Sequence, residues 1–350
     1  MTLKVAVVGA GYWGPNLVRN FDRSDRWEVV AVCDLDHARA SRVVGPRPDI
    51  RVETSLARLL ADDDIDAVAV ATPARTHRAV ALAAIEAGKH VLVEKPLADS
   101  FAEAEVMTVA ARERGLTLMC DHTYCYSPAV QRIGEMVADG TVGEVLFVDS
   151  VRINLGLVQP DVDVFWDLAP HDLSILDYVL PGGLRPESVA AHGADPLGAG
   201  RACVGYLTMP LPGGAIAHVH VNWLSPTKIR KLVIGGSRRT IVWDDLNPQQ
   251  RLSVYDRGVD LASQSTTGTD RASATVSYRL GDMHAPSLPE REALAAMVEE
   301  FADAIEGGRS SRTDGEAGLR VLSVLEAASE SLALRGRGVV PRSVTTAAMA

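Results

Sequence analysis

The feature that most restricts the fold of this chain is a glycine-rich turn near the N-terminus. An apolar run at 3–8 leads into Gly9-Ala10-Gly11-Tyr12-Trp13-Gly14, and a helical pattern follows directly. In that context the first glycine permits a tight turn, the second lets a pyrophosphate approach the backbone, and the third lets helix and strand pack closely. The free N–H groups at the helix start also favour phosphate. The pattern predicts a dinucleotide site that comprises Gly9, Gly11, Tyr12, Trp13 and Gly14.

An acidic residue stands at the distance that this turn requires. Asp34 ends the second apolar run, about 20 residues beyond Gly14. A carboxylate there accepts hydrogen bonds from the adenosine ribose hydroxyls and repels a 2′-phosphate, so NAD is favoured over NADP. Arg39 and Arg42 lie close in sequence and could weaken that preference. The alternative is a solvated aspartate at a strand end.

The first third of the chain alternates apolar runs with helical patterns. The helical patterns are 15–21, 38–44, 76–87 and 100–114. The apolar runs are continuous, as in strands buried on both faces of a parallel sheet, and cover 3–8, 29–33, 67–71, 90–93 and 117–120. Repeated units of this kind predict an α/β domain with a doubly wound parallel sheet and right-handed crossovers.

The pattern changes after Gly140, where strands follow one another with few helices between them. We expect helices at 170–180, 291–306 and 315–334, a polar loop at 264–273 and a loose tail at 345–350. The expected strands are 145–153, 188–192, 203–208, 216–223, 229–234, 240–243 and 252–255. The sequence therefore predicts a Rossmann domain, 1–122, that binds NAD. It also predicts an α+β domain, 123–350, with a mostly antiparallel open sheet for substrate and oligomer contacts, whose last two helices pack back on the first domain.

Composition and charge limit the kinds of molecule that this chain is expected to bind. A formal charge of −10 argues against nucleic acid, and no apolar run reaches the roughly 18 residues that span a bilayer. The N-terminus lacks the features of a signal peptide, so we expect a cytoplasmic protein that does not bind a membrane. The four cysteines form no Cys-x-x-Cys pair and no cluster has zinc spacing, so we expect reduced thiols and no metal.

Two further motifs follow the third and fourth apolar runs of the first domain. They are Thr72-Pro73-Ala74-Arg75-Thr76-His77 and Glu94-Lys95-Pro96. Both lie at the carboxyl ends of predicted parallel strands, where α/β sheets form their ligand crevices. The residues alone leave two interpretations of Lys95: an exposed lysine paired with Glu94, or a side chain that reaches over a bound nicotinamide.

Together with the glycine turn, these motifs resemble the glucose–fructose oxidoreductase / inositol dehydrogenase / rhizopine-catabolism (Gfo/Idh/MocA) superfamily over nearly the whole chain. The resemblance implies a homo-oligomeric, nicotinamide-dependent sugar dehydrogenase acting on CH–OH groups. Lys95 would contact the reacting hydroxyl and the nicotinamide ribose. The resemblance adds a set of cofactor-binding residues at these strand ends, namely Thr72, Pro73, His77, Glu94, Lys95 and Pro96.

The superfamily's second active-site mark, Asp-x-x-x-His, stands here as Asp167-Leu168-Ala169-Pro170-His171. Pro170 suits the first turn of a helix, which would place His171 at the positive end and keep its imidazole neutral, as a general base requires. Asp167 would orient the ring. The alternative is a structural histidine. Asp172 should point to another side of the helix and is a weaker candidate.

A finer resemblance concerns the substrate. The segments 122–124, 152–156, 164–172 and 218–224 are similar to bacterial UDP-N-acetylglucosamine (or its uronic acid) 3-dehydrogenases, which implies oxidation at C3 on the way to diacetamido sugars. Arg152 and Asn154, with Lys95, Asp167 and His171, are the predicted substrate contacts, although an exposed strand-end role suits the first two equally. A cluster for the diphosphate would comprise Arg152, Lys228, Arg230 and Lys231, unless these are ordinary solvated charges.

Alternatives remain within this fold. An inositol or free-sugar dehydrogenase, or a deoxysugar ketoreductase, would use the same residues, whereas a non-catalytic NAD-dependent sensor would not need Lys95, Asp167 and His171 together. His218 and His220 share one face of a strand without a third metal ligand. Helices are expected on only one face of the second sheet. We therefore predict that an apolar open face bearing Val219, Val221 and Trp223 is covered in a homotetramer.

Overall fold

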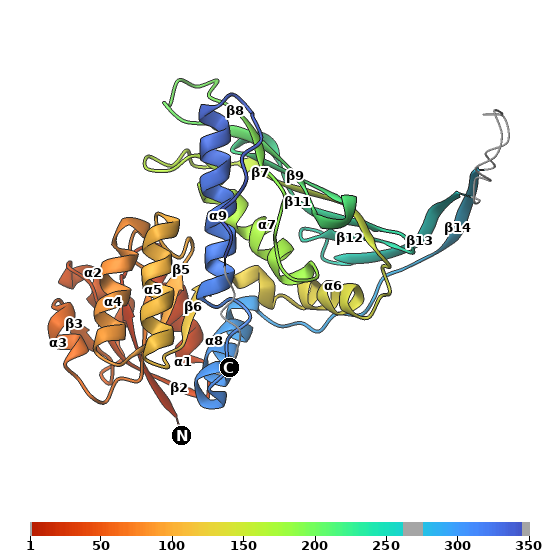
Figure 1. Ribbon diagram of the computed structural model, residues 1–350. Helices are drawn as coiled ribbons and strands as arrows, with labels where there is room; N and C mark the ends of the chain where they lie inside the picture. Colours follow the sequence, from red (N-terminus) through yellow and green to blue (C-terminus); the bar gives the residue numbers. More distant parts are fainter. Residues whose placement is uncertain (1, 262–275, 345–350) are drawn as a thin grey trace.

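A computed structural model describes residues 2–261 and 276–344. The N-terminal part of the described chain holds a six-stranded parallel sheet in the order β3-β2-β1-β4-β5-β6, which confirms the predicted doubly wound architecture (Figure 1). The order reverses between β1 and β4, so the crevice at their carboxyl ends is the expected ligand position. The strands are β1 (Leu3–Val8), β2 (Trp27–Cys33), β3 (Arg51–Glu53), β4 (Ala67–Val70), β5 (His90–Glu94) and β6 (Leu118–Asp121).

Helices cover both faces of this sheet, and most begin at a capping side chain. Asp36, Ser55 and Ser100 each accept a hydrogen bond from the backbone of the first helical turn. Two short elements, β3 and α3, were not predicted because three and five residues are too few to show a periodicity. The helices are α1 (Gly14–Asp22), α2 (His37–Val44), α3 (Leu56–Leu60), α4 (His77–Glu86) and α5 (Phe101–Glu113), with a short 3₁₀ turn at Ala74–Thr76.

The second sheet has eight strands in the described residues, in the order β14-β13-β12-β11-β7-β10-β9-β8, and only β10 and β7 pair in parallel. This confirms a mostly antiparallel sheet. Strands β13 and β14 project from the body as an arm (Figure 1), and the loop predicted at 264–273 lies outside the described residues, as does the predicted tail. The strands are β7 (Val145–Leu155), β8 (Ala190–Ala194), β9 (Val204–Pro210), β10 (Ile216–Asn222), β11 (Leu224–Gly236), β12 (Thr240–Asp244), β13 (Leu252–Leu261) and β14 (Val276–His284).

Helices α7 and α9 pack on one face of this sheet (Figure 1). Val219, Val221 and Trp223 are buried on that helix-covered side, so the prediction that they form the open face is wrong. The alternate residues of β10 face away, because neighbouring side chains in a strand point to opposite faces. The remaining helices and 3₁₀ turns are α6 (Pro128–Ala138), α7 (Val164–Val179), α8 (Ala293–Gly307), α9 (Gly315–Ala333), Thr123–Tyr126 and Pro212–Gly214.

Helix α7 begins at Val164 rather than at Pro170, so the predicted helix start is wrong. Asp163 caps the helix by accepting hydrogen bonds from the backbone N–H groups of Phe165 and Trp166. Phe165 is fully buried against Gly205, where a Cβ atom would lie 2.1 Å from its ring. A proline inside a helix costs about 3 kcal/mol. The cap and the burial of Phe165 offset that cost. The helix therefore starts six residues before Pro170 and continues through it.

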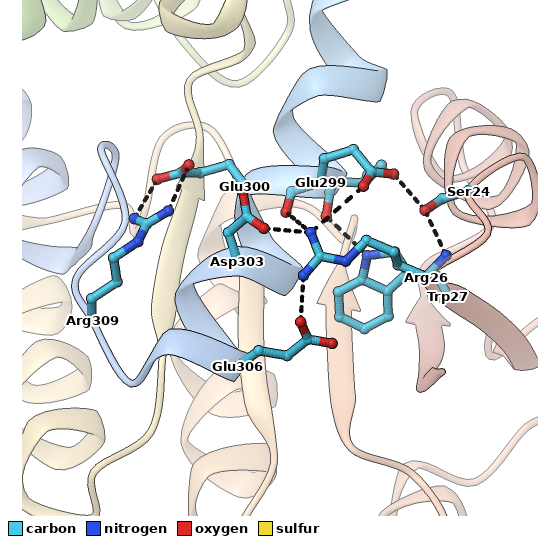
Figure 2. A network of polar contacts seen from close by, with 9 residues as sticks. Ser24, Arg26, Trp27, Glu299, Glu300, Asp303, Glu306 and Arg309 are labelled. Atoms are coloured by element: carbon cyan, nitrogen blue, oxygen red, sulfur yellow. Dashed lines mark hydrogen bonds and ion pairs between the residues drawn. The ribbon is translucent and has the colours of Figure 1, made fainter. Parts of the chain in front are cut away.

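Helix α8 packs beside α1 of the first sheet domain and joins it through a polar network (Figure 2). Arg26 donates hydrogen bonds to Asp303 and Glu306. These side chains are partly exposed, and exposed ion pairs contribute about 0–1 kcal/mol each. The larger contribution comes from Trp27, which stacks on Phe301 with ring centroids 5.3 Å apart and is buried. No helix in residues 2–261 or 276–344 is long and apolar enough to cross a membrane.

Candidate active site

A cleft of about 1010 Å³ runs along the carboxyl ends of β1, β2, β4 and β5. Its walls include the glycine turn, the end of β2, the two strand-end motifs of the first domain and the first turn of α7. Residues from every predicted cofactor segment therefore line one cavity, among them Gly11, Asp34, Thr72, Lys95 and Asp167. The volume matches the upper end of the range for cofactor sites.

The glycine turn has the shape that a pyrophosphate needs. Gly9 has a positive φ of 102°, and a Cβ atom on Gly14 would lie 2.1 Å from the Gly9 carbonyl oxygen, so both positions require glycine. A Cβ on Gly11 would meet nothing within 4 Å, which leaves open space above the backbone. Helix α1 begins at Gly14, so its free N–H groups face this space. The residues present fit a dinucleotide phosphate.

Asp34 lies at the far end of the same cleft. One carboxylate oxygen accepts a hydrogen bond from the Ala10 N–H at 2.8 Å, and the other accepts one from the Asp36 N–H at 2.9 Å. Both oxygens retain lone pairs for ribose hydroxyls. Arg39 also lines the cleft, with its guanidinium 3.7 Å from Asp34, whereas Arg42 does not line it. Of the two arginines considered from the sequence, only Arg39 is placed to modify the ribose site.

His77 does not line the cleft, which corrects its predicted role as a cofactor contact. It is buried, and its two ring nitrogens lie 2.7 Å from the Thr72 carbonyl oxygen and 2.9 Å from the Pro96 carbonyl oxygen. Burial lowers the pKa of His77, although the two carbonyl groups oppose this shift. The side chain joins the loop after β4 to the loop after β5. It therefore positions the two strand-end motifs, with Lys95 on the second.

Lys95 and Asp167 meet at the inner end of the cleft. The Lys95 ammonium donates a hydrogen bond to the Asp167 carbonyl oxygen at 2.9 Å and lies 3.5 Å from a carboxylate oxygen of the same residue. The other carboxylate oxygen accepts a hydrogen bond from the Trp223 indole at 2.9 Å. Asp167 therefore holds Lys95 and not the ring of His171, which corrects the prediction that it orients that ring. Lys95 links the first domain to α7.

His171 lies one turn further along α7, on the same side as Asp167. Its Nδ1 atom is buried without a hydrogen-bond partner in the described residues, and its ring meets the Tyr124 ring edge-on at 5.2 Å. Burial lowers the pKa of His171 well below its usual value, and the positive charges of Lys95 and Arg152 add to this effect. A lowered pKa favours the neutral imidazole that the sequence predicts, and its causes here are burial and neighbouring cations. The helix N-terminus is not the cause, because His171 lies within the helix.

Arg152 is buried beneath this group and does not line the cleft. Its guanidinium donates hydrogen bonds to Asp172 at 2.7 and 3.2 Å, and Ser150 donates a third at 2.8 Å. The guanidinium also lies 4.5 Å from the centre of the Tyr124 ring. Asp172 does point away from His171, as predicted, and its role is to neutralise Arg152. The predicted contact between Arg152 and substrate is therefore replaced by an internal ion pair that supports Tyr124 and His171.

The basic residues proposed for a diphosphate do not gather. Arg230 donates a hydrogen bond to the Tyr124 hydroxyl at 2.7 Å, on the same face of the sheet as Arg152. Lys231 is exposed and lies on the opposite face, opposite Val151. Lys228 is also exposed, in the irregular stretch of β11 before Ile229. Asn154 is half-buried beside Gly156. The cluster prediction is wrong because alternation along β11 separates its members.

Several residues of the site were not predicted to have a role in it. Trp223 binds Asp167, and Tyr124 lies between two guanidinium groups and His171. His122 is buried, and neither of its ring nitrogens has a partner within the described residues. The signal in the sequence was the position of 122–124 directly after a predicted strand, at the same edge as Lys95. In the same residues no group of three potential metal ligands occurs, and all four cysteines are free and buried.

The arrangement provides the groups that an alcohol oxidation requires. A neutral imidazole can accept a hydroxyl proton, and a lysine ammonium can stabilise the developing negative charge on the oxygen. A cofactor site for hydride transfer extends from Asp34 to Lys95 along one cleft. Hydrogen bonds hold Lys95 on Asp167 and Asp167 on Trp223, and such fixed orientation of reacting groups favours catalysis.

Comparisons with known proteins agree with this geometry. Residues 3–122 match the oxidoreductase family with an NAD-binding Rossmann fold, and residues 130–242 match the GFO/IDH/MocA C-terminal domain. The UDP-N-acetylglucosamine 3-dehydrogenase of Acidithiobacillus ferrooxidans is 30% identical over 92% of this chain and 94% of its own length. Its crystal structure has a TM-score of 0.80, covering 96% of this chain and 100% of that one at 27% identity.

Two further proteins are similar to this chain. GenD2 from gentamicin A biosynthesis, solved in complex with NAD, has a TM-score of 0.78 at 27% identity and covers 98% of this chain and 97% of its own. An uncharacterised oxidoreductase of Streptococcus pneumoniae is 32% identical over 55% of this chain, a match that spans 54% of that protein. Both halves of the sequence and the whole fold point to one family, as the motifs predicted. The chain belongs to the GFO/IDH/MocA family of NAD-binding oxidoreductases and is a dehydrogenase.

Proposed function

We propose that this dehydrogenase oxidises the C3 hydroxyl of a pyranose, most favourably one carried on UDP. The observation that carries the chemistry is the contact of Lys95 with Asp167 at the inner end of the cofactor cleft, one helical turn before His171, whose pKa is lowered by burial. The substrate would enter between that end and the helix-covered face of the second sheet.

The mechanism follows from the charges of these groups. NAD supplies the hydride acceptor when bound. A ring nitrogen of His171 takes the proton of the sugar hydroxyl, and the Lys95 ammonium donates a hydrogen bond to the oxygen as negative charge develops on it. Asp167 orients the Lys95 ammonium toward this oxygen through the 2.9 and 3.5 Å contacts. The same groups run in reverse for a ketone.

The identity of the sugar rests on similarity. The UDP-N-acetylglucosamine 3-dehydrogenase of Acidithiobacillus ferrooxidans matches along 94% of its length, whereas the match to an inositol 2-dehydrogenase of Saccharopolyspora erythraea spans 57% of that protein. The basic residues expected to bind a diphosphate do not support this assignment. Arg152 is paired with Asp172, and Lys231 lies on the opposite face of the sheet.

The test is a substrate panel. Purified protein with NAD is given UDP-N-acetylglucosamine, its uronic acid, glucose, glucose 6-phosphate and myo-inositol at equal concentration, and the absorbance of reduced cofactor is followed. We expect the highest kcat/KM for one of the two UDP-sugars. Faster turnover of a free sugar or inositol would overturn the substrate assignment and leave Lys95 and His171 in place. A Lys95→Met variant serves as the inactive control.

We also infer that a second copy of the chain covers the open face of the second sheet, within a homotetramer. Phe147 and Ile216 are exposed neighbours on this face, and Tyr206 stacks on His220 beside them with ring centroids 4.3 Å apart. Such an exposed apolar patch is typical of an interface. Light scattering at micromolar concentration should give the mass of four chains, and Ile216→Lys should reduce it. A monomeric wild type would refute this.

A further inference from the structure

Two carboxyl groups lie side by side beneath the inner end of the cleft. Glu94 is the last residue of β5 and Asp121 the last of β6, and the two are direct partners in the parallel pairing. Asp121 is 2% exposed, and the Oε1 atom of Glu94 is buried. Since adjacent strands are about 4.8 Å apart, the two carboxyl groups are close neighbours, and Glu94 also lines the cleft. Two unpaired charges there would be strongly unfavourable.

The hydrogen-bond donors around the pair are distributed unequally. Asp121 accepts a hydrogen bond from the Trp13 indole at 2.9 Å and another from the Thr123 hydroxyl. Glu94 accepts one at Oε2, from the Lys95 backbone N–H at 3.1 Å, while its Oε1 has no donor in the described part of the chain. The anion is therefore better stabilised on Asp121. If Glu94 carries a proton, its carboxyl group can donate a hydrogen bond to the Asp121 carboxylate.

The other titratable groups around the pair leave this distribution unchanged. Burial raises the pKa of Glu94 well above its usual value, and the charge of Asp121 and a hydrogen bond with it raise it further, against the opposing charge of Lys95. Burial lowers the pKa of His122 to about 4, so this side chain is neutral. Burial also raises the pKa of the Cys120 thiol. Lys95 is thus the one cation next to the pair among these neighbours.

The order of the strands places this pair relative to a bound cofactor. From Asp34 on β2, the cleft passes the glycine turn after β1 and Thr72 after β4, and it reaches Glu94 and Lys95 at the end of β5. An NAD whose ribose lies on Asp34 and whose pyrophosphate lies over the turn brings its nicotinamide to β5. The Trp13 indole also ties Asp121 to the turn itself.

We propose that Glu94 and Asp121 share one proton and together hold a single negative charge beneath the nicotinamide, which favours the oxidised cofactor over the reduced one. The inference rests on the cofactor placement of the proposed function and extends it. The oxidised nicotinamide ring is cationic and the reduced ring is neutral. A fixed negative charge nearby therefore stabilises the first without stabilising the second. Glu94 has this role as an acid, whereas Lys95 acts on the substrate.

Infrared spectroscopy of the full-length protein tests the protonation directly. We expect the carbonyl stretch of a protonated carboxyl group at neutral pH in the wild type and its loss in Glu94→Gln. Glu86→Gln, at an exposed carboxylate on α4, should leave the band in place. A wild type without this band at pH 7 overturns the inference, whatever the variants do. The same holds if the band persists in a folded Glu94→Gln protein.

Binding measurements test the effect on the cofactor. Glu94→Gln replaces the protonated acid by a neutral amide and keeps the charge on Asp121, so the ratio of the Kd values for NADH and NAD should stay within about twofold of wild type. The double variant Glu94→Gln with Asp121→Asn has no charge, and the ratio should fall about tenfold, as expected for a unit charge roughly 10 Å away at an effective dielectric constant of about 20. An unchanged ratio in the double variant overturns the inference.

These outcomes are separate from the fate of the proposed function. The infrared band and the two Kd values need no sugar. If the whole substrate panel failed, the proposed substrate would be wrong while the band and the Kd ratio still supported the pair. If NAD failed to bind to the wild type, the proposed cofactor position would be wrong even if the infrared band were present. The proposed effect of the pair on the cofactor would then be wrong as well.

Discussion

Replacement of Arg152 by methionine should destabilise the protein strongly, although this residue touches neither cofactor nor cleft. Arg152 is 3% exposed and Asp172 is 4% exposed, and the pair forms two hydrogen bonds at 2.7 and 3.2 Å. The variant leaves a buried carboxylate with the Ser150 hydroxyl as its remaining donor among the contacts described. Breaking one side of a buried ion pair costs about 3–5 kcal/mol. At about 2–4 °C per kcal/mol, the melting temperature should fall by roughly 6–20 °C.

The assay is calorimetry and urea unfolding of the variant beside a matched double variant, Arg152→Met with Asp172→Leu. The double variant removes both charges and should recover most of the lost stability, because an apolar pair of similar volume often replaces a buried ion pair without loss. A change below about 1 kcal/mol in the single variant would refute the reasoning. So would a double variant that is less stable than the single one.

The same substitution has an effect on catalysis that a merely structural role would not produce. The charge of Arg152 is one of those that lower the pKa of His171, after burial and Lys95. Without that charge the pKa of His171 rises. The base is then protonated at a higher pH, and the acidic limb of kcat/KM moves to higher pH in the part of the variant that remains folded. A limb at its wild-type position would show that Arg152 does not act on His171.

Three further predictions concern the site itself. Asp34→Ala should weaken NAD binding and narrow the preference over NADP, and an unchanged affinity by calorimetric titration would exclude it as the ribose residue. Lys95→Met should still bind NAD but lose turnover by about a hundredfold or more on the verified substrate; near-normal turnover would contradict its role. His171→Asn should depress turnover and remove the acidic limb of the rate profile, since activity of the neutral base is lost as pH falls through its pKa. Survival of that limb at the same midpoint would identify another base.

Local pattern was sufficient to predict much of this molecule. The glycine turn, Asp34 and the strand-end motif at Lys95 are governed by backbone geometry within a few residues, and the structure places all of them along one cleft. Strand β1 has the predicted bounds because a buried parallel strand has a continuous apolar run. The change from one domain type to the other was also visible as a change in periodicity. The short strand β3 and helix α3 were not predicted, because three and five residues are too few to show a hydrophobic periodicity.

Long-range contacts account for what the pattern could not predict. Asp167 binds Trp223, which lies 56 positions away, and Arg152 pairs with Asp172 across a strand and a helix. The start of α7 depends on whether Phe165 finds Gly205 to pack on. The buried side of β10 depends on where α7 lies. The partner of a buried side chain depends on how helices and strands pack against one another. The spacing of residues along the chain does not reveal that packing.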